Sequence, residues 1–190
     1  MNNISNIDER KLVAIMFADI VGFSRMMAID EKKTLSIISD FENLCTSIIN
    51  QYNGEIIKKV GDELFCEFAS SKQAVDCAIK IQNAIANYNK RDIDKDFKLE
   101  IRIGIHVGDV IKQNNDIYGE GVNVASRIQP LASPGGISIS GAVNDTISNH
   151  SGYTVRFQGK RQLKNIKQKH SIYEVITGHE TETYKVKNKN

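Results

Sequence analysis

The sequence has no tryptophan, only two prolines and only three cysteines in 190 residues. The odd number of cysteines argues against a disulfide scaffold, and Cys45, Cys66 and Cys77 form no CxxC or His/Cys pattern of a metal site. Each cysteine lies among apolar residues and is expected to be buried. No apolar run approaches the roughly 18–20 residues that a membrane-spanning helix needs. We therefore expect a cytoplasmic chain with no membrane contact of its own.

The sequence also lacks an excess of charge of one sign, since 25 lysines and arginines face 23 acidic residues for a net charge of +2. A general nucleic-acid binder would carry a clear basic excess, so no nucleic-acid partner is expected. Hydrophobic residues make up 41% and charged residues 25%, as in an ordinary globular domain. We expect one folded domain at residues 11–177, between a flexible N-terminal segment at 1–10 and a flexible C-terminal tail at 178–190.

The apolar patterning predicts an α+β fold. The run Leu12–Phe17 predicts a buried strand, and apolar spacings of three and four from Ile38 to Tyr52 predict a long helix that Gly54 caps. Strict alternation over Leu99–Val107 predicts a strand with one buried face. The other expected elements are strands at Glu55–Val60, Glu63–Phe68, Ile137–Ile139, Tyr153–Phe157 and Ser171–Ile176, and helices at 74–88, 121–131 and 143–147. This order resembles a ferredoxin-like split βαβ core with additional strands and helices.

The first chemical motif is FADIVGFS at residues 17–24, where Asp19 ends an apolar strand and Gly22 leads into a helix. Backbone N–H groups in such a turn can bind phosphate, and a carboxylate there can bind a hard cation such as Mg²⁺. Taken alone, an aspartate at this place more often ends a strand and touches no ligand.

The second motif is KKVGDELF at residues 58–65, which places Asp62 at the tip of a tight Gly61-Asp62 hairpin. Aspartate is a common turn former, so Asp62 alone indicates a turn. Two strands with acidic tips can, however, lie side by side in one sheet. Asp19 and Asp62 could then share a pair of metal ions, which lie about 4 Å apart in two-metal enzymes.

The third motif is DIYGEGVNVASR at residues 116–127. Asn123 and Arg127 are four residues apart and share a helix face, from which they could hold a ribose oxygen and a phosphate as charge develops. The alternative is a solvated pair on an exposed helix, which leaves Asp116 in the glycine-rich approach unexplained.

Together with GIHVGDV at residues 104–110, these motifs resemble the catalytic domain of class III adenylate and guanylate cyclases over Leu12–Val175. The resemblance implies the class III cyclase fold and a lyase that converts ATP to 3′,5′-cyclic AMP and pyrophosphate. It also implies two divalent metal ions, Mg²⁺ or Mn²⁺, and a head-to-tail homodimer with its active sites at the interface. The alternatives are a guanylate or pyrimidine nucleotide cyclase and a catalytically silent nucleotide-binding regulatory module.

The resemblance assigns roles residue by residue. Asp19 and Asp62 are the expected metal ligands, Asn123 is expected to position the ribose, and Arg127 is expected to stabilise the transition state at the α-phosphate. The backbone carbonyl of Ile20 is expected to help bind metal, and the triphosphate is expected to lie along Ile20, Val21, Gly22, Phe23 and Ser24.

The same resemblance makes Lys58 and Asp116 the base-selecting pair. A lysine can donate to a ring nitrogen of adenine and an aspartate can accept from its N6 amino group, so this pair favours ATP. Lys59 should face the other way along the strand and is expected to be solvated.

Lys167 is the expected triphosphate-binding lysine because of its distance from Tyr173, with Lys164 as the alternative. Asp109 stands where some members of the family carry a phosphate-binding arginine, so this contact is expected to be missing. His106 has no ligand partner nearby in the sequence and is expected to be structural.

Overall fold

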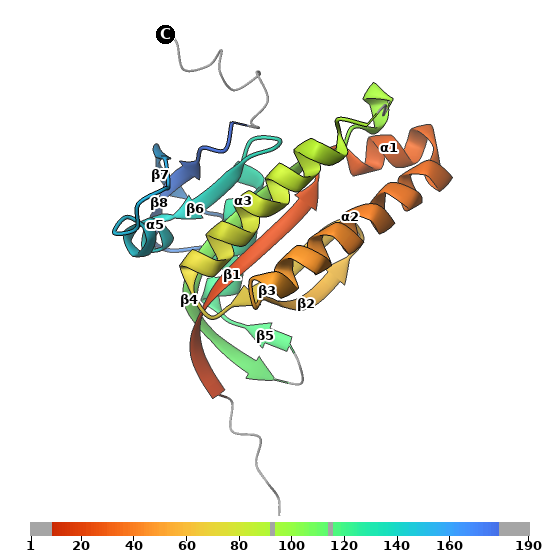
Figure 1. The fold of residues 1–190 in the computed structure, drawn as a ribbon. Helices are drawn as coiled ribbons and strands as arrows, with labels where there is room; N and C mark the ends of the chain where they lie inside the picture. The colour runs from red at the N-terminus through yellow and green to blue at the C-terminus, as the bar shows by residue number, and fades with distance from the viewer. Residues whose placement is uncertain (1–8, 92–93, 114–115, 179–190) are drawn as a thin grey trace, which may run out of the picture.

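The computed structural model describes residues 9–91, 94–113 and 116–178 (Figure 1). The predicted flexible ends therefore lie largely outside the described residues. Glu9 and Arg10 do not belong to an irregular segment, because β1 (Glu9–Ile20) includes them and extends to both sides of the predicted apolar run. The strands that follow are β2 (Glu55–Val60), β3 (Glu63–Phe68), β4 (Ile101–Gln113), β5 (Asp116–Tyr118), β6 (Ile137–Ser140), β7 (Val155–Gln162) and β8 (Lys169–Val175). The helices are α1 (Phe23–Ile29), α2 (Glu31–Gln51), α3 (Ser71–Tyr88), α4 (Glu120–Ile128) and α5 (Gly141–Ile147), with short 3-10 turns η1 (Lys95–Phe97) and η2 (Gln129–Leu131).

One mixed sheet organises the fold, with the strand order β2-β3-β1-β4-β6-β8-β7 and with β5 paired to β4. Its first four strands, β2-β3-β1-β4, are antiparallel neighbours with α2 connecting β1 to β2 and α3 connecting β3 to β4. This is the ferredoxin-like split βαβ arrangement that the order of elements predicted. The additional strands β6, β8 and β7 extend the sheet beyond β4.

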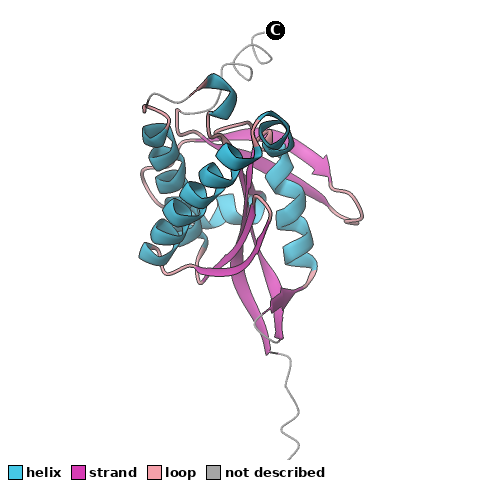
Figure 2. Cartoon of the chain, turned by 90° about the vertical axis from the view of Figure 1, so that its right-hand side faces the viewer, coloured by secondary structure: helices cyan, strands magenta, loops and turns pink. Residues whose placement is uncertain are grey.

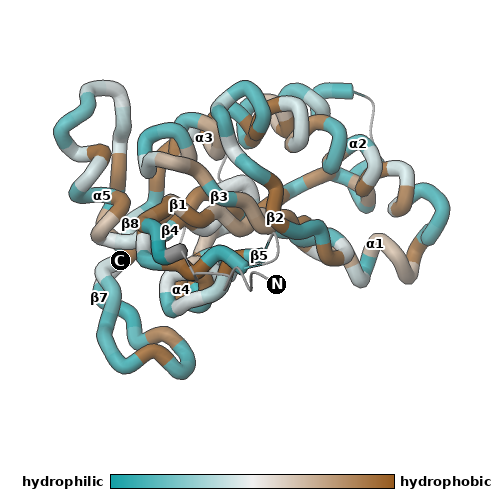
Figure 3. Tube along the Cα trace, turned by 90° about the horizontal axis from the view of Figure 1, so that it is seen from below, coloured by the Kyte–Doolittle hydropathy of each residue, from teal (hydrophilic) through white to brown (hydrophobic). Residues whose placement is uncertain are grey.

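Helices cover both faces of the sheet (Figures 2 and 3). The main core lies between the sheet and α2 and α3, and it includes all three cysteines, which are buried and unpaired as expected. A second apolar cluster, built on Val13, Ile15, Phe17 and Phe65, packs against Ala125 of α4 on the opposite face. The prediction of a single buried face for β4 was therefore wrong, because α4 packs against that strand and both Gly104 and His106 on its second face are buried.

The end of α2 also differs from the prediction. Asn53, with φ of 55°, takes the left-handed conformation after the helix, so Gly54 is not the residue that caps it. Gly54 is needed for another reason, since a Cβ there would lie 2.4 Å from the ring of Phe68 and 2.8 Å from Ile49. The glycine therefore allows α2 to pass closely over β3.

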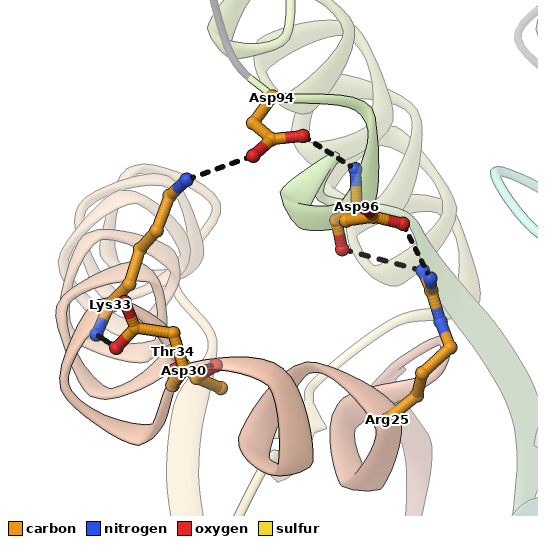
Figure 4. A network of polar contacts seen from close by, with 6 residues as sticks. All are labelled: Arg25, Asp30, Lys33, Thr34, Asp94 and Asp96. Carbon is orange, nitrogen blue, oxygen red and sulfur yellow. Dashed lines mark hydrogen bonds and ion pairs between the residues drawn. The ribbon is translucent and has the colours of Figure 1, made fainter.

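Polar contacts tie the first two helices to η1 (Figure 4). Arg25 of α1 donates to the Asp96 carboxylate at 3.0 Å, and Lys33 of α2 donates to Asp94 at 3.4 Å. Asp30 caps α2 by accepting from the Lys33 amide at 2.9 Å. These contacts hold α1 and α2 beside η1, the short turn that precedes β4.

Candidate active site

The two aspartates singled out in the sequence meet at one end of the sheet. Asp19 stands at the end of β1, Asp62 lies in the β2–β3 turn, and a hydrogen bond joins their carboxyl groups. Burial, and then this neighbouring carboxyl group, raise the pKa of Asp19 to about 7. The turn takes the predicted hairpin form, with Gly61 at φ of 61°.

The structure adds two charged residues that the sequence analysis missed. Glu63 and Arg102 lie directly across from Asp19 on β3 and β4. The charge of Glu63 contributes to the raised pKa of Asp19, while the guanidinium of Arg102 opposes it. Burial and the charge of Asp62 also raise the pKa of Glu63. Cross-strand register brings Asp19, Glu63 and Arg102 together, and the adjoining hairpin turn adds Asp62. The register between two strands is not visible in the sequence of either strand alone.

The donors at this site fit a hard divalent cation. Among the described residues, no group of three or more His, Cys, Asp and Glu side chains could hold a metal ion. Two carboxylates in direct contact nevertheless repel each other when both are ionised, and a divalent cation between them removes that repulsion. Mg²⁺ commonly binds through one or two carboxylates and completes its shell with water and substrate phosphates.

The turn after β1 has the backbone form that the first motif suggested. Gly22 has φ of 75° and precedes α1, and among the described residues no side chain caps that helix. The Val21 amide is held by the Glu100 carbonyl at 2.8 Å. Gly22 and Ser24 are exposed and Phe23 is partly exposed, so the start of α1 faces solvent next to Asp19.

The predicted base-selecting residues are joined directly. Lys58 of β2 forms an ion pair with Asp116 of β5. Asp116 also accepts from the Ile117 amide at 2.9 Å and from the Tyr118 hydroxyl. The ion pair with Lys58 is the main reason why the pKa of Asp116 lies below its usual range.

Tyr118 is the residue of this group that the sequence analysis did not name. Its side chain is exposed, and the ring centroid lies 5.9 Å from the Lys58 ammonium nitrogen. Lys59 points to the other face of the sheet, as predicted, and pairs there with Glu42 of α2 at 3.0 Å.

The helix that carries the third motif packs very closely on β4. Asn123 and Arg127 are both exposed on α4, while Val124, Ala125 and Ile128 are buried beneath them. The predicted shared face of Asn123 and Arg127 is therefore present. Close packing depends on glycine, since a Cβ on Gly108 would lie 3.0 Å from the Gly121 Cα atom.

The two candidate triphosphate lysines lie in the short loop between β7 and β8. Lys164 and Lys167 are both exposed, whereas Leu163 and Ile166, each directly before one of these lysines, are buried against α4 in a cluster with Ile128. The loop is thus anchored to the helix that carries Arg127. Both lysines remain candidates.

His106 occupies a buried position, and its Nδ1 atom lies 2.8 Å from the Ser140 hydroxyl oxygen. Its ring meets the ring of His170 edge to face, with centroids 5.8 Å apart. Burial and the neighbouring His170 lower the pKa of His106 to about 4. Asp109 is exposed.

A family model described as the adenylate and guanylate cyclase catalytic domain matches residues 6–187. The chain is 36% identical over 158 residues to the putative adenylate cyclase 3 of Rhizobium meliloti (strain 1021), a match that covers 83% of this chain and 27% of that protein. It is 28% identical over 125 residues to an adenylate cyclase of Streptomyces coelicolor (strain ATCC BAA-471 / A3(2) / M145). This match covers 65% of this chain and 31% of that protein. The chain therefore spans about a third or less of the length of these relatives.

Solved structures share the fold. An adenylate/guanylate cyclase/hydrolase from Silicibacter pomeroyi superposes with a TM-score of 0.82 at 31% identity, covering 88% of this chain and 98% of that chain. The adenylyl cyclase CyaB from P. aeruginosa superposes with a TM-score of 0.78 at 25% identity, covering 88% and 95%. In the part of this chain that the structure describes, no helix has the length and apolar character to cross a membrane.

Proposed function

The chain belongs to the family of adenylate and guanylate cyclase catalytic domains, and we propose that it converts ATP to 3′,5′-cyclic AMP and pyrophosphate. In this reaction the ribose 3′-oxygen attacks the α-phosphorus, the 3′-hydroxyl loses its proton, and the bond to the departing pyrophosphate breaks. The named relatives include adenylate cyclases, which supports ATP as the substrate.

The pair of Lys58 and Asp116 is the observation that carries the choice of ATP. A cation that only donates and a carboxylate that only accepts lie in contact at the edge of the sheet. Adenine presents the matching pattern, with acceptor ring nitrogens beside an N6 amino donor. Guanine presents the opposite polarity at these positions, so the same pair would leave its polar groups unmatched.

Asp19, Asp62 and the Ile20 carbonyl would hold two divalent metal ions, Mg²⁺ or Mn²⁺. Bound there, such ions lower the pKa of the attacking hydroxyl and offset the charge of the triphosphate. The Val21 amide already donates to the Glu100 carbonyl, so the backbone N–H groups of Gly22 to Ser24 would bind the phosphates next to the aspartates, with Lys167 or Lys164 as a further cationic contact.

Arg127 and Asn123 would act on the reacting atoms. The guanidinium of Arg127 would stabilise the negative charge that gathers on the α-phosphate as the new bond forms. Asn123, one helical turn away on the same exposed face, would hold the ribose so that its 3′-oxygen lies in line for attack. We assign no protein general base.

We propose a head-to-tail homodimer as the active form. Asp19 follows Phe17 by two residues and so faces the α4 side of the sheet, where Lys58 also lies opposite Phe65. One subunit would supply Asp19 and Asp62. Its partner would supply the base-selecting residues Lys58 and Asp116, together with Asn123 and Arg127 on α4. Each dimer would then contain two equivalent sites.

A nucleotide panel tests the proposed substrate. Purified chain is incubated with ATP, GTP, CTP or UTP and with Mg²⁺ or Mn²⁺, and the products are identified by chromatography and mass spectrometry. We expect cyclic AMP from ATP as the main product. Cyclic GMP as the main product would replace this proposal with a guanylate cyclase, and no product from any nucleotide would support a silent regulatory module.

Complementation tests the shared site. Asp19→Ala and Arg127→Ala should each be inactive as homodimers, because each removes a residue from both sites. A mixture should recover activity, since one site of the mixed dimer retains Asp19 from one subunit and Arg127 from the other. An inactive mixture in which sedimentation or native mass spectrometry detects mixed dimers would contradict the shared site.

A further inference from the structure

A narrow ribbon carries Asp116 beyond the broad part of the sheet. β3 pairs with β1 only from Ala14 onward, so among the described strands only β4 pairs with residues 9–13 of β1. β5 adds to the far end of β4, with Asp116 opposite Gln113 (Figure 1). A ribbon of two or three strands has little stability of its own. Its contacts with β2 and β3, together with the burial of Ile117 against α4, must therefore define where Asp116 lies.

Four charged residues make that connection. Lys112 of β4 lies 3.0 Å from the Glu55 carboxylate of β2 and 3.5 Å from the Glu67 carboxylate of β3. Lys11 of β1 also pairs with Glu67. We call these four residues the ribbon clamp. Both lysines come from the ribbon and both glutamates come from the broad sheet.

Because the Glu67 carboxylate is buried, the ribbon clamp is stable only when its lysines stay close to that carboxylate. The Glu67 side chain is only 8% exposed, and a buried carboxylate is costly unless cations stay beside it. Glu55 lies directly across from Glu67, so two like charges also need compensation. Lys112 contacts both of them, which holds the end of β4 in one place. The hydrogen bond with Lys112 also lowers the pKa of Glu55 and raises that of Lys112.

A β-bulge places the ribbon clamp and the base-selecting lysine on the same face. Glu55 and Lys58 are three residues apart and would face opposite sides in a regular strand. The register shift between Ile56 and Lys58 instead sets Glu55 across from Glu67 and Lys58 across from Phe65. Lys112 thus binds the strand that carries Lys58, while its own backbone lies beside the strand that carries Asp116.

We propose that the ribbon clamp positions Asp116 against Lys58 and thereby sets the selectivity for the nucleotide base. This inference rests on the proposed function and adds four positioning residues that do not touch the nucleotide. Without the clamp, the ribbon would sample positions in which Asp116 and Lys58 separate. Guanine would then be rejected less strongly, and ATP would bind less tightly.

Lys112→Met removes the central charge and keeps most of the side-chain length. We expect the ratio of kcat/KM for ATP to that for GTP to fall about fivefold, which corresponds to about 1 kcal/mol. The change should lie mainly in KM for ATP, because Arg127 is untouched. Lys72→Met is the matched control, since it breaks an exposed ion pair with Asp76 on α3, where Nζ and Oδ2 are 2.6 Å apart. The control should keep the wild-type ratio.

Amide hydrogen exchange supplies a readout that needs no substrate. NMR should detect about fivefold faster exchange across β5 in Lys112→Met and no change there in Lys72→Met. An unchanged selectivity ratio in an active enzyme, or unchanged exchange in β5, overturns the inference. A wild-type chain that makes no cyclic nucleotide overturns the proposed function instead, and exchange then still tests the position of β5.

Charge exchange separates positioning from a general loss of folding. Glu55→Lys and Lys112→Glu should each lower the selectivity, and the double variant should recover much of it by restoring one opposite-charge pair. If Lys112→Met does not fold, Glu55→Gln takes its place, because this side chain is 55% exposed and its loss is mild. We expect Glu55→Gln to change selectivity and β5 exchange in the same direction, and no change in either overturns the inference.

Discussion

Gly104→Ala is the substitution that most directly tests how the fold places α4, the helix that carries Asn123 and Arg127. Gly104 lies on the face of β4 that α4 and η2 cover, and a Cβ there would lie 2.3 Å from the Gln129 backbone nitrogen and 2.4 Å from its Cα atom. An ordinary contact needs at least 3.4 Å, so the backbone at Gln129 would have to move by about 1 Å. Trimming the Gln129 side chain cannot relieve this clash, because the nearest atoms belong to the main chain.

The expected result has a stability part and an activity part. Overpacking of this kind costs about 1–3 kcal/mol, and each 1 kcal/mol lowers Tm by about 2–4 °C in a chain of this size. Gln129 follows Arg127 by two residues, so the same displacement moves the guanidinium that is proposed to act at the α-phosphate. A misplacement of about 1 Å can cost on the order of 10²-fold in rate. We therefore expect kcat to fall much more than the modest loss of Tm would suggest.

Thermal unfolding and steady-state kinetics measure the two parts separately. Gly141→Ala is the control, because a Cβ there would lie 3.3 Å from the Ser171 Cβ atom, only about 0.1 Å inside the 3.4 Å limit of an ordinary contact. This control should keep nearly the wild-type Tm and kcat. A Gly104→Ala protein with wild-type Tm and kcat would refute the argument that close packing at Gly104 sets the position of α4.

Three further predictions follow from the site. Asp19→Ala should abolish turnover, as should chelation of divalent ions, while circular dichroism stays native; turnover at the wild-type rate would remove Asp19 from metal binding. Lys58→Glu combined with Asp116→Cys should weaken use of ATP and admit GTP in the nucleotide panel, and an unchanged preference would exclude this pair from base selection. Between pH 6.5 and 4 the unfolded chain protonates His106 while the folded chain, with burial and His170 holding that pKa at about 4, does not. The contribution of His106 to the free energy of unfolding should therefore fall by roughly 3 kcal/mol as the pH drops through this window, and urea titrations of His106→Gln, compared with the wild type at each pH, should lack that component.

Helices and strands could be predicted from the sequence where a turn motif or an apolar periodicity was strong. The hairpin from Glu55 to Phe68 has the predicted bounds, because Gly61-Asp62 marks the turn between two short runs rich in apolar residues. The long helices were found by their apolar stripes, although the start of α2 depends on the Asp30 cap rather than on hydrophobicity. β5 was missed, since three residues carry no periodicity.

The candidate site was predictable only in part for a related reason. A motif identifies residues that stand together in the sequence, so Asp19, Asp62, Asn123 and Arg127 could be named without coordinates. Glu63 lies beside Asp62 in the same motif, yet its effect on Asp19 comes from pairing across two strands. Tertiary proximity of this kind has no local signal, and the sequence offered none for Arg102 or Tyr118.

The β-bulge in β2 changes which face of the sheet Glu55 occupies relative to Lys58. Strict alternation of side chains along the strand would have placed these two residues on opposite faces. A strict period of two puts Glu55 and Lys59 on one face and Lys58 on the other. The inserted residue reverses this for Glu55, so that Glu55 and Lys58 both face the α4 side and Lys59 faces α2. The ribbon clamp and the proposed base-selecting pair share one face of the sheet because of that single extra residue. Base selectivity in this chain would therefore depend on the register of an edge strand as much as on the two side chains that would meet the base.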